Sequence, residues 1–376
     1  MTSAAPPVVI VGHGTRSAKG AAEFGRLIDR VWDRSRGRIP AVDGGFIELS
    51  EPPIGEVINR MIVARGGWEG AGQSATPTQS RPGPPTHSQP AILADPVGAL
   101  NAPWELVAIP LVLTAAGHGK GDIPAALARE QARHPGLSYR YGRPLGPHPA
   151  LQNILEARID AALDGAPRRG TLVVLVGRGA TDPDGNAEVA KVARLLWEGR
   201  GYDEVEFSFV SLAEPSVPAA LERARKLGAR RIVVAPYFLF PGVLPDRIVA
   251  QSRQFAAAHP ELDLRTADLI GDCDELADLV LERYEEALRG DIRMNCDTCA
   301  YRIALPGFAD KVGRPRTPHF HPADVPDHDH VSFGGFRRGH SWQAHEHVPT
   351  EPRQFLNPAH EHIHAGMTRP NEEVQR

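Results

Sequence analysis

The sequence predicts an α/β fold made of two similar lobes, each a parallel β-sheet flanked by helices. With 376 residues, the chain is long enough for about two domains of ordinary size. Segments of the first half recur in the same order in the second half, which indicates an internal duplication. Within each copy, short apolar β-branched segments alternate with segments of helical periodicity, a pattern typical of parallel strands covered by helices.

The first element of each copy is a buried strand that ends in a glycine turn. Residues 8–14, Val-Val-Ile-Val-Gly-His-Gly, return as residues 172–179, Leu-Val-Val-Leu-Val-Gly-Arg-Gly. Apolar residues at helical spacing follow both turns, over residues 24–31 and again over residues 189–196. Each copy therefore opens with a strand, a tight turn and an amphipathic helix.

The second and third strands also have counterparts. Residues 45–52 match residues 208–215, and residues 107–113 match residues 233–239. Because the second and third strands lie closer together in the second copy, the first copy must contain an insertion between them. Residues 66–90, rich in Gly, Ser, Thr, Gln and Pro, are expected to form this insertion as a disordered surface loop.

The expected organisation follows from these matches. Residues 1–165 form an N-terminal lobe that carries the functional groups, and residues 166–290 form a similar lobe with a degenerate site. Residues 291–376 contain a Cys-x-x-Cys pair and a histidine-rich tail that is expected to be disordered.

Composition excludes several classes of protein. A net charge of −4 lacks the basic excess of a nucleic-acid binder. No apolar run reaches the roughly 18 to 20 residues that a membrane-spanning helix needs. Three cysteines cannot form a fully paired disulfide framework, which favours a reducing cytoplasm.

Polar residues at the strand ends differ between the two copies, and these differences mark candidate functional groups. Ligands of open parallel sheets bind beyond the carboxyl ends of the strands. At these ends His13 is replaced by Arg178 and Glu48 by Ser211, and His118 matches a stretch of the second copy without histidine. Two imidazoles and a carboxylate at one sheet edge can hold a borderline divalent metal or supply a base beside it.

Residues that are kept in both copies are expected to be structural. Glu51 and Glu214 both precede a proline, as at the entry to a helix. The glycines around His13 and Arg178 need only provide tight turns. Of the two glutamates in residues 46–52, Glu48 is therefore the better functional candidate.

Three segments resemble the CbiX-type sirohydrochlorin chelatases. They are residues 12–16 (Gly-His-Gly-Thr-Arg), 46–52 (Phe-Ile-Glu-Leu-Ser-Glu-Pro) and 117–124 (Gly-His-Gly-Lys-Gly-Asp-Ile-Pro). Members of this family are class II, ATP-independent chelatases, and the long members contain two fused copies of one lobe. The resemblance covers most of residues 7–260 and implies that His13 and His118 are the active-site histidines.

The resemblance implies a lyase that inserts Co²⁺ into sirohydrochlorin on the route to cobalamin, or Fe²⁺ on the route to sirohaem. His13, His118 and Glu48 would hold the metal or take up the pyrrole protons, and the sequence leaves the division of these roles open. Cationic side chains near the strand ends would bind the substrate carboxylates, namely Arg16, Lys120, Arg178 and Arg247. The sequence contains no Gly-x-x-x-x-Gly-Lys-Ser/Thr phosphate loop, in agreement with a reaction that needs no nucleotide. His148, just before Pro149, is expected to start a helix, with substrate contact as the alternative.

A second set of candidate metal ligands follows the lobes. Cys296 and Cys299 form a Cys-x-x-Cys pair, and Cys273 is a candidate third ligand. Such a pair can ligate an iron–sulfur cluster or zinc or act as a redox dithiol, and the absence of any metal is the remaining alternative. Long members of the family have a similar segment associated with an iron–sulfur centre, so the resemblance implies a cluster, shared between the subunits of a homodimer.

The tail concentrates the histidines of the chain. Ten of the 16 histidines lie between His319 and His364, four pairs of them in His-x-His spacing. These imidazoles are expected to bind Co²⁺, Ni²⁺ or Zn²⁺ transiently, with a merely solvated tail as the alternative. Two other functions compete with the chelatase: a metal-binding chaperone or storage protein on the same fold, and a protein that carries the tetrapyrrole without metallating it.

Overall fold

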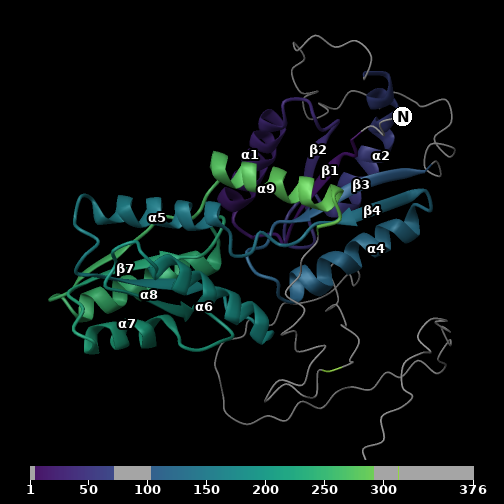
Figure 1. Cartoon of the computed structure of the whole chain (residues 1–376). Coiled ribbons are helices and arrows are strands. Elements are labelled where there is room, and N and C mark those ends of the chain that lie inside the picture. Colours follow the sequence, from purple (N-terminus) through teal and green to yellow (C-terminus); the bar gives the residue numbers. More distant parts are fainter. Residues whose placement is uncertain (1–4, 72–102, 292–311, 313–376) are drawn as a thin grey trace, which may run out of the picture. The chain divides into compact units, whose positions relative to one another are not determined.

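The computed structural model describes residues 5–71, 103–291 and 312, and within these residues the two predicted parallel sheets are present (Figure 1). The first sheet contains the strands β1 (Val8–Gly12), β2 (Val42–Phe46), β3 (Trp104–Pro110) and β4 (Leu137–Tyr141). The second contains the strands β5 (Thr171–Gly177), β6 (Glu204–Phe209), β7 (Arg231–Pro236) and β8 (Asp263–Thr266). The helices of the first half are α1 (Ala18–Ser35), α2 (Ile54–Ala71), the π-helical turn η1 (His118–Asp122), α4 (Ile123–Arg133) and α5 (Pro149–Leu163). Those of the second half are α6 (Pro183–Trp197), α7 (Val217–Lys226), α8 (Val243–Ala258) and α9 (Asp274–Leu288).

The two sheets share one topology, which confirms the predicted fold class. The strand orders are β2-β1-β3-β4 and β6-β5-β7-β8, and every pairing is parallel. Because chain order reverses beside β1 and β5, the carboxyl end of each of these strands is a switch point where a parallel sheet binds ligands. The third strands end earlier than expected, at Pro110 and Pro236, so the matching residues beyond them belong to loops.

The central strand of each lobe is buried on both faces. In β1, Val8 and Ile10 pack into the core that contains α1, while Val9 and Val11 pack into the core beneath α2 and α4. This burial explains why the strands read as continuous apolar runs rather than as an alternating pattern. Helix α2 extends to Ala71, so residues 66–71 are helical and not part of the expected disordered insertion. Once a helix has formed, each further residue adds one hydrogen bond at small cost, and glycines there weaken it without ending it.

Helices α5 and α9 exchange lobes. Helix α5 follows the first sheet in sequence but packs on the second sheet, against β7, β8 and α6, whereas α9 packs on α1 and β3 of the first lobe (Figure 1). Arg158 of α5 donates to the carbonyls of Leu269 (3.0 Å) and Ile270 (2.9 Å). Tyr284 of α9 donates to the carbonyl of Pro6 (2.7 Å). The boundary expected near residue 165 thus separates the sheets but not the helices that cover them.

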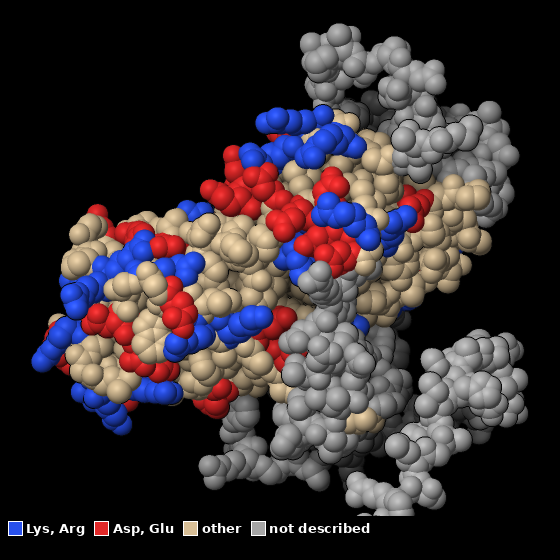
Figure 2. Space-filling view, viewed as in Figure 1, with Lys and Arg blue, Asp and Glu red and all other residues tan. Residues whose placement is uncertain are grey.

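A row of ion pairs on the surface joins α9 to α1. Arg34 Nη1 lies 3.0 Å from Asp274 Oδ2, and its Nη2 lies 2.5 Å from Asp278 Oδ2, while Arg30 also pairs with Asp274. On the face shown in Figure 2, blue and red side chains accordingly lie next to one another rather than in separate patches. These groups are exposed, so each pair adds little to the free energy of folding.

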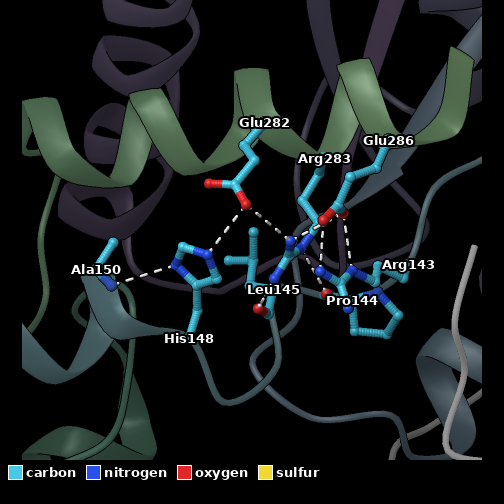
Figure 3. Close-up of polar contacts among 8 residues, drawn as sticks. All are labelled: Arg143, Pro144, Leu145, His148, Ala150, Glu282, Arg283 and Glu286. Atoms are coloured by element: carbon cyan, nitrogen blue, oxygen red, sulfur yellow. Dashed lines mark hydrogen bonds and ion pairs between the residues drawn. The ribbon is translucent and has the colours of Figure 1, made fainter. Parts of the chain in front are cut away.

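A buried network holds α9 from the other side (Figure 3). The side chain of Arg283 is 1% exposed. Its Nε donates to the carbonyl of Pro144 (3.1 Å), its Nη2 to that of Leu145 (2.7 Å), and its Nη1 to Glu286 Oε2 (2.9 Å). Arg143 Nε donates to the same carboxylate oxygen (2.8 Å). The network therefore fixes α9 to the segment that leads from β4 to α5, the other exchanged helix.

His148 marks the start of α5, as expected from the proline that follows it. Its Nδ1 accepts a hydrogen bond from the Ala150 backbone N–H (3.2 Å), which makes it the N-cap residue. Its Nε2 lies 3.2 Å from Glu282 Oε1 of α9 (Figure 3). Since Nδ1 accepts, Nε2 carries the proton and donates to the carboxylate. His148 thus links the two exchanged helices.

The helices within the described ranges are all too short or too polar to span a membrane.

Candidate active site

The loops after the first and second strands have the same backbone in both lobes. Glu48 N donates to the carbonyl of His13 (3.1 Å), and Ser211 N donates to that of Arg178 (3.0 Å). Gly14 has a φ of 111°, and a methyl group on it would lie 1.7 Å from the Glu48 carbonyl oxygen. Gly179 has the same restriction against Ser211, at 1.8 Å. The scaffold is therefore duplicated, and only the side chains it presents differ.

The segment after the second strand carries further paired features. Leu49 and Leu212 both have a left-handed backbone, with φ of 63° and 61°, and both are exposed. Each is followed by a glutamate and a cis proline, at Glu51–Pro52 and Glu214–Pro215. These shared features belong to the conformation of the loop, which agrees with the expectation that the duplicated glutamates are structural.

The first lobe uses this scaffold to present a histidine–carboxylate pair. His13 follows β1 and Glu48 follows β2, and His13 Nε2 lies 2.6 Å from Glu48 Oε1. The side chain of Glu48 is only 7% exposed, and that of His13 is 24% exposed. His13 Nδ1 faces the carbonyl of Gly14 at 3.3 Å. Both ring nitrogens thus face acceptor oxygens, so His13 and Glu48 are arranged to hold a proton between them.

His118 lies in η1, directly after β3, and meets His13 at the same sheet edge. The two imidazole rings are 4.0 Å apart between centroids and inclined by 77°. His118 Nδ1 lies 2.6 Å from Asp122 Oδ2, one helical turn further on. Its Nε2 lies 2.5 Å from Nη1 of Arg178, which comes from the second lobe. The structure therefore brings four residues from four strand ends into contact: His13, Glu48, His118 and Arg178.

These contacts define the protonation state of His118. A guanidinium can only donate, so His118 Nε2 must accept the hydrogen bond from Arg178 with its lone pair. The proton then resides on Nδ1 and is donated to Asp122. Burial, with the positive groups of His13 and Arg178 beside it, lowers the pKa of His118 to about 4, although the bond to Asp122 acts in the opposite direction. At neutral pH, His118 is therefore a neutral imidazole whose Nε2 lone pair faces a cation.

Asp122 was not singled out from the sequence, although its position contains the signal. It lies four residues after His118, the spacing that places two side chains on one face of a helix. A carboxylate on the far nitrogen is the usual support of a functional histidine. A second support is Tyr141, whose hydroxyl donates to the Gly119 carbonyl (2.7 Å).

The three candidate metal ligands are bound to one another and to Arg178 rather than arranged around a vacant centre. In the part of the chain that the structure describes, no group of three or more His, Cys, Asp or Glu side chains is placed to hold a metal ion. Coordination by His13, Glu48 and His118 together would require the His13–Glu48 proton and the Arg178 contact to be displaced.

Comparison with known proteins assigns the family. The CbiX family model matches residues 7–66, 98–162 and 172–287, which is more than half of the chain and includes both lobes. The chain belongs to the CbiX family. The resemblance expected from the three motifs is thereby confirmed.

Relatives of this CbiX chain carry chelatase names. It is 33% identical over 301 residues to a sirohydrochlorin cobaltochelatase of Priestia megaterium, covering 79% of this chain and 85% of the relative. It is 26% identical over 280 residues to a sirohydrochlorin ferrochelatase of Bacillus subtilis, covering 74% and 90%. The solved structure of SirB from Bacillus subtilis with Fe³⁺ aligns with a TM-score of 0.58 at 24% identity, over 77% of this chain and 99% of that one. This last likeness establishes the fold.

The other expected substrate-binding cations of the CbiX chain lie in different environments. Arg16, in the loop after β1, and Arg247, in the first turns of α8, are exposed. Lys120 instead is buried, and its Nζ lies 2.6 Å from Asp184 Oδ2 and 3.0 Å from Asp182 Oδ2. Lys120 was expected to bind substrate carboxylates, but η1 places its side chain at the contact between the lobes, where Asp182 and Asp184 bind it.

Among the cysteines, Cys273 lies within the described residues of the CbiX chain, at the N-cap of α9. Burial raises the pKa of its thiol, which favours the neutral form over the thiolate that ligates metals. Cys296, Cys299 and the tail histidines lie outside the described residues.

Proposed function

We propose that this CbiX-family chain is a cytoplasmic sirohydrochlorin chelatase, a lyase that inserts Co²⁺ or Fe²⁺ without a nucleotide. The observation that carries the proposal is the neutral imidazole of His118, held beside the His13–Glu48 pair at the carboxyl edge of the first sheet. The names of the relatives support a chelatase over a metal-storage protein, and both Co²⁺ and Fe²⁺ occur among them.

The chemistry of metallation matches this arrangement. Insertion replaces two pyrrole N–H protons by a divalent cation, so the site must accept protons and provide ligands that replace water on the metal. His118 Nε2 can do either, because its lone pair is preserved by the Nδ1–H bond to Asp122. His13 and Glu48 are in direct contact, and the Glu48 carboxylate can offset part of the charge of the entering ion.

Arg178 has a defined part in this proposal. In the structure its guanidinium occupies the Nε2 lone pair of His118, so it must move before that atom can bind metal or accept a proton. A carboxylate of the substrate is the natural new partner, since guanidinium–carboxylate bonds are among the strongest charge-assisted hydrogen bonds. Exposed Arg16 and Arg247 are proposed to bind further carboxylates of the macrocycle.

The test is metallation itself. Purified protein is mixed anaerobically with sirohydrochlorin and either Co²⁺ or Fe²⁺, and the change of the tetrapyrrole absorbance is followed against protein-free mixtures. We expect a rate that is proportional to protein concentration for at least one of the two metals. A rate equal to the spontaneous one with both metals would contradict the proposal. Metal binding without such a rate would instead favour the storage alternative.

We also infer that Cys296 and Cys299 bind an iron–sulfur cluster shared between the subunits of a homodimer, with zinc as the alternative. The basis is the Met-x-Cys-x-x-Cys segment after α9. Anaerobically purified protein is expected to contain iron and acid-labile sulfide and to sediment as a dimer, and a Cys296→Ala/Cys299→Ala variant should lose both metal and sulfide. Zinc without sulfide in the wild type would contradict the cluster, and a monomer would contradict its sharing.

A further inference from the structure

A cluster of buried charges joins the two lobes next to the active site. Lys120 of η1 contacts Asp182 and Asp184 at the start of α6, and the three side chains are 2%, 4% and 0% exposed. Lys120 lies two residues after His118, and residues at this spacing in a helical turn point to different sides. One side of η1 therefore presents His118 to His13, and another side binds the second lobe.

Two further contacts fix the same segment to α6. The backbone N–H of Ala115 donates to Glu188 Oε2 (2.7 Å). Gly185 lies so close to Ala116 that a methyl group on the glycine would come within 2.8 Å of the alanine Cβ. The chain before and after His118 is thus held directly against the N-terminal turns of α6.

A single loop of the second lobe engages η1 at both places. Arg178 at the start of this loop bonds to His118 Nε2, and Asp182 and Asp184 at its end bond to Lys120. Asp182 is also the N-cap of α6, since its carboxylate accepts from the Asp184 N–H (3.2 Å). Any displacement of Lys120 from this loop would therefore change the position of His118 relative to Arg178.

The electrostatics of the cluster argue against a simple stabilising role. One ammonium faces Asp182, Asp184 and Glu188, and burial raises the pKa of Glu188 to about 7. Desolvation of so many charges offsets most of their attraction, so a buried ionic cluster contributes more to a defined geometry than to the free energy of folding. The geometry it defines here is that of the segment carrying His118.

We propose that Lys120 is a positioning residue that clamps η1 to the second lobe and so keeps His118 Nε2 aligned for metal insertion. The role in catalysis rests on the proposed function. The role in placing His118 rests on the contacts alone and can be tested without substrate.

The first experiment measures kcat and KM of metallation separately for variants of Lys120. Lys120→Met removes the charge and keeps an unbranched side chain of similar length. In the folded variant, kcat of metallation is expected to fall by roughly 10- to 100-fold, because small misplacements of a reacting group cost rate. KM for sirohydrochlorin should change little, since the Lys120 side chain is 2% exposed and is proposed to act only through η1. Lys120→Arg, which retains the charge, should recover part of kcat.

Arg168→Met is the matched control. Arg168 precedes β5 at the amino end of the second sheet, opposite the active-site edge, and pairs there with Glu156 and Asp160. Its loss should lower the unfolding midpoint while kcat stays that of the wild type. Should Lys120→Met fail to fold, Asp184→Asn provides the same test with the shape of the side chain preserved.

The second experiment observes His118 directly in the protein without substrate. With ¹⁵N-labelled histidine, the wild type is expected to show one signal pair of a neutral imidazole protonated at Nδ1, which is assigned by its loss in His118→Gln. Lys120→Met should shift this pair toward averaged tautomers, and Arg168→Met should not. Unchanged His118 signals together with an unchanged kcat would overturn the proposal. An inactive wild type would instead refute the proposed function, and the His118 signals would still test the clamp.

Discussion

Replacing His118 by alanine is expected to reduce kcat of metallation by about 100-fold or more, the range of a lost general base. The variant loses the imidazole whose Nε2 lone pair accepts from Arg178 while its Nδ1–H donates to Asp122. Because the pKa of His118 is about 4, this lone pair is present throughout the neutral pH range. Initial rates with saturating Co²⁺ or Fe²⁺ under anaerobic conditions provide the measurement.

Substitutions of Asp122, which accepts the Nδ1–H bond of His118, should reduce activity by smaller amounts. Asp122→Ala removes the acceptor of Nδ1–H and is expected to cost about 10- to 100-fold, as for other residues that orient a functional imidazole. Asp122→Asn keeps an acceptor oxygen and should cost less than the alanine variant. His259→Ala, at the C-cap of α8 in the second lobe, is the control and should retain full activity. If His118→Ala were as active as His259→Ala, His118 would have no part in the reaction.

The two parallel sheets, and the residues that lie at the ends of their strands, could be predicted from the sequence. The duplicated pattern predicted two parallel sheets, and parallel strands place their carboxyl ends at one edge, so His13, Glu48 and His118 could be expected to meet there. The comparison of copies was informative because the loop backbones are nearly identical. With the same hydrogen bonds around His13 and Arg178, the change of side chain between the copies leaves the fold of the loop unchanged.

The contacts between the two lobes could not be predicted from the sequence. Periodicity predicts that α9 is a helix but not that it covers the first sheet, because the apolar face of an amphipathic helix fits either sheet. Lys120 was expected to bind a substrate carboxylate because it lies near a strand end, whereas its partners Asp182 and Asp184 are more than sixty positions away in the sequence. Long-range pairings of this kind leave no local pattern.

Replacing Arg283 by methionine is expected to destabilise the protein by about 3 kcal/mol, the size of effect seen when one partner of a buried ionic network is removed. The substitution leaves the carbonyls of Pro144 and Leu145 without the donor that Arg283 provides, in a region where its side chain is 1% exposed (Figure 3). Burial lowers the pKa of Arg283, but an arginine remains charged even so. Urea unfolding followed by circular dichroism gives the free energy of unfolding.

Two variants identify the source of this effect. Arg283→Lys retains the charge but lacks the planar fork that reaches two carbonyls and Glu286 at once, so it should recover only part of the lost stability. Arg34→Met removes exposed ion pairs between α1 and the same helix α9 and should shift the unfolding midpoint far less. If Arg34→Met and Arg283→Met were equally destabilising, then α9 would be held by its surface pairs, and the buried network would not be what fixes the exchanged helices. If Arg283→Lys were as stable as the wild type, a positive charge alone would account for the stabilisation. The forked hydrogen bonds to the segment before α5 would then contribute nothing to the free energy of unfolding.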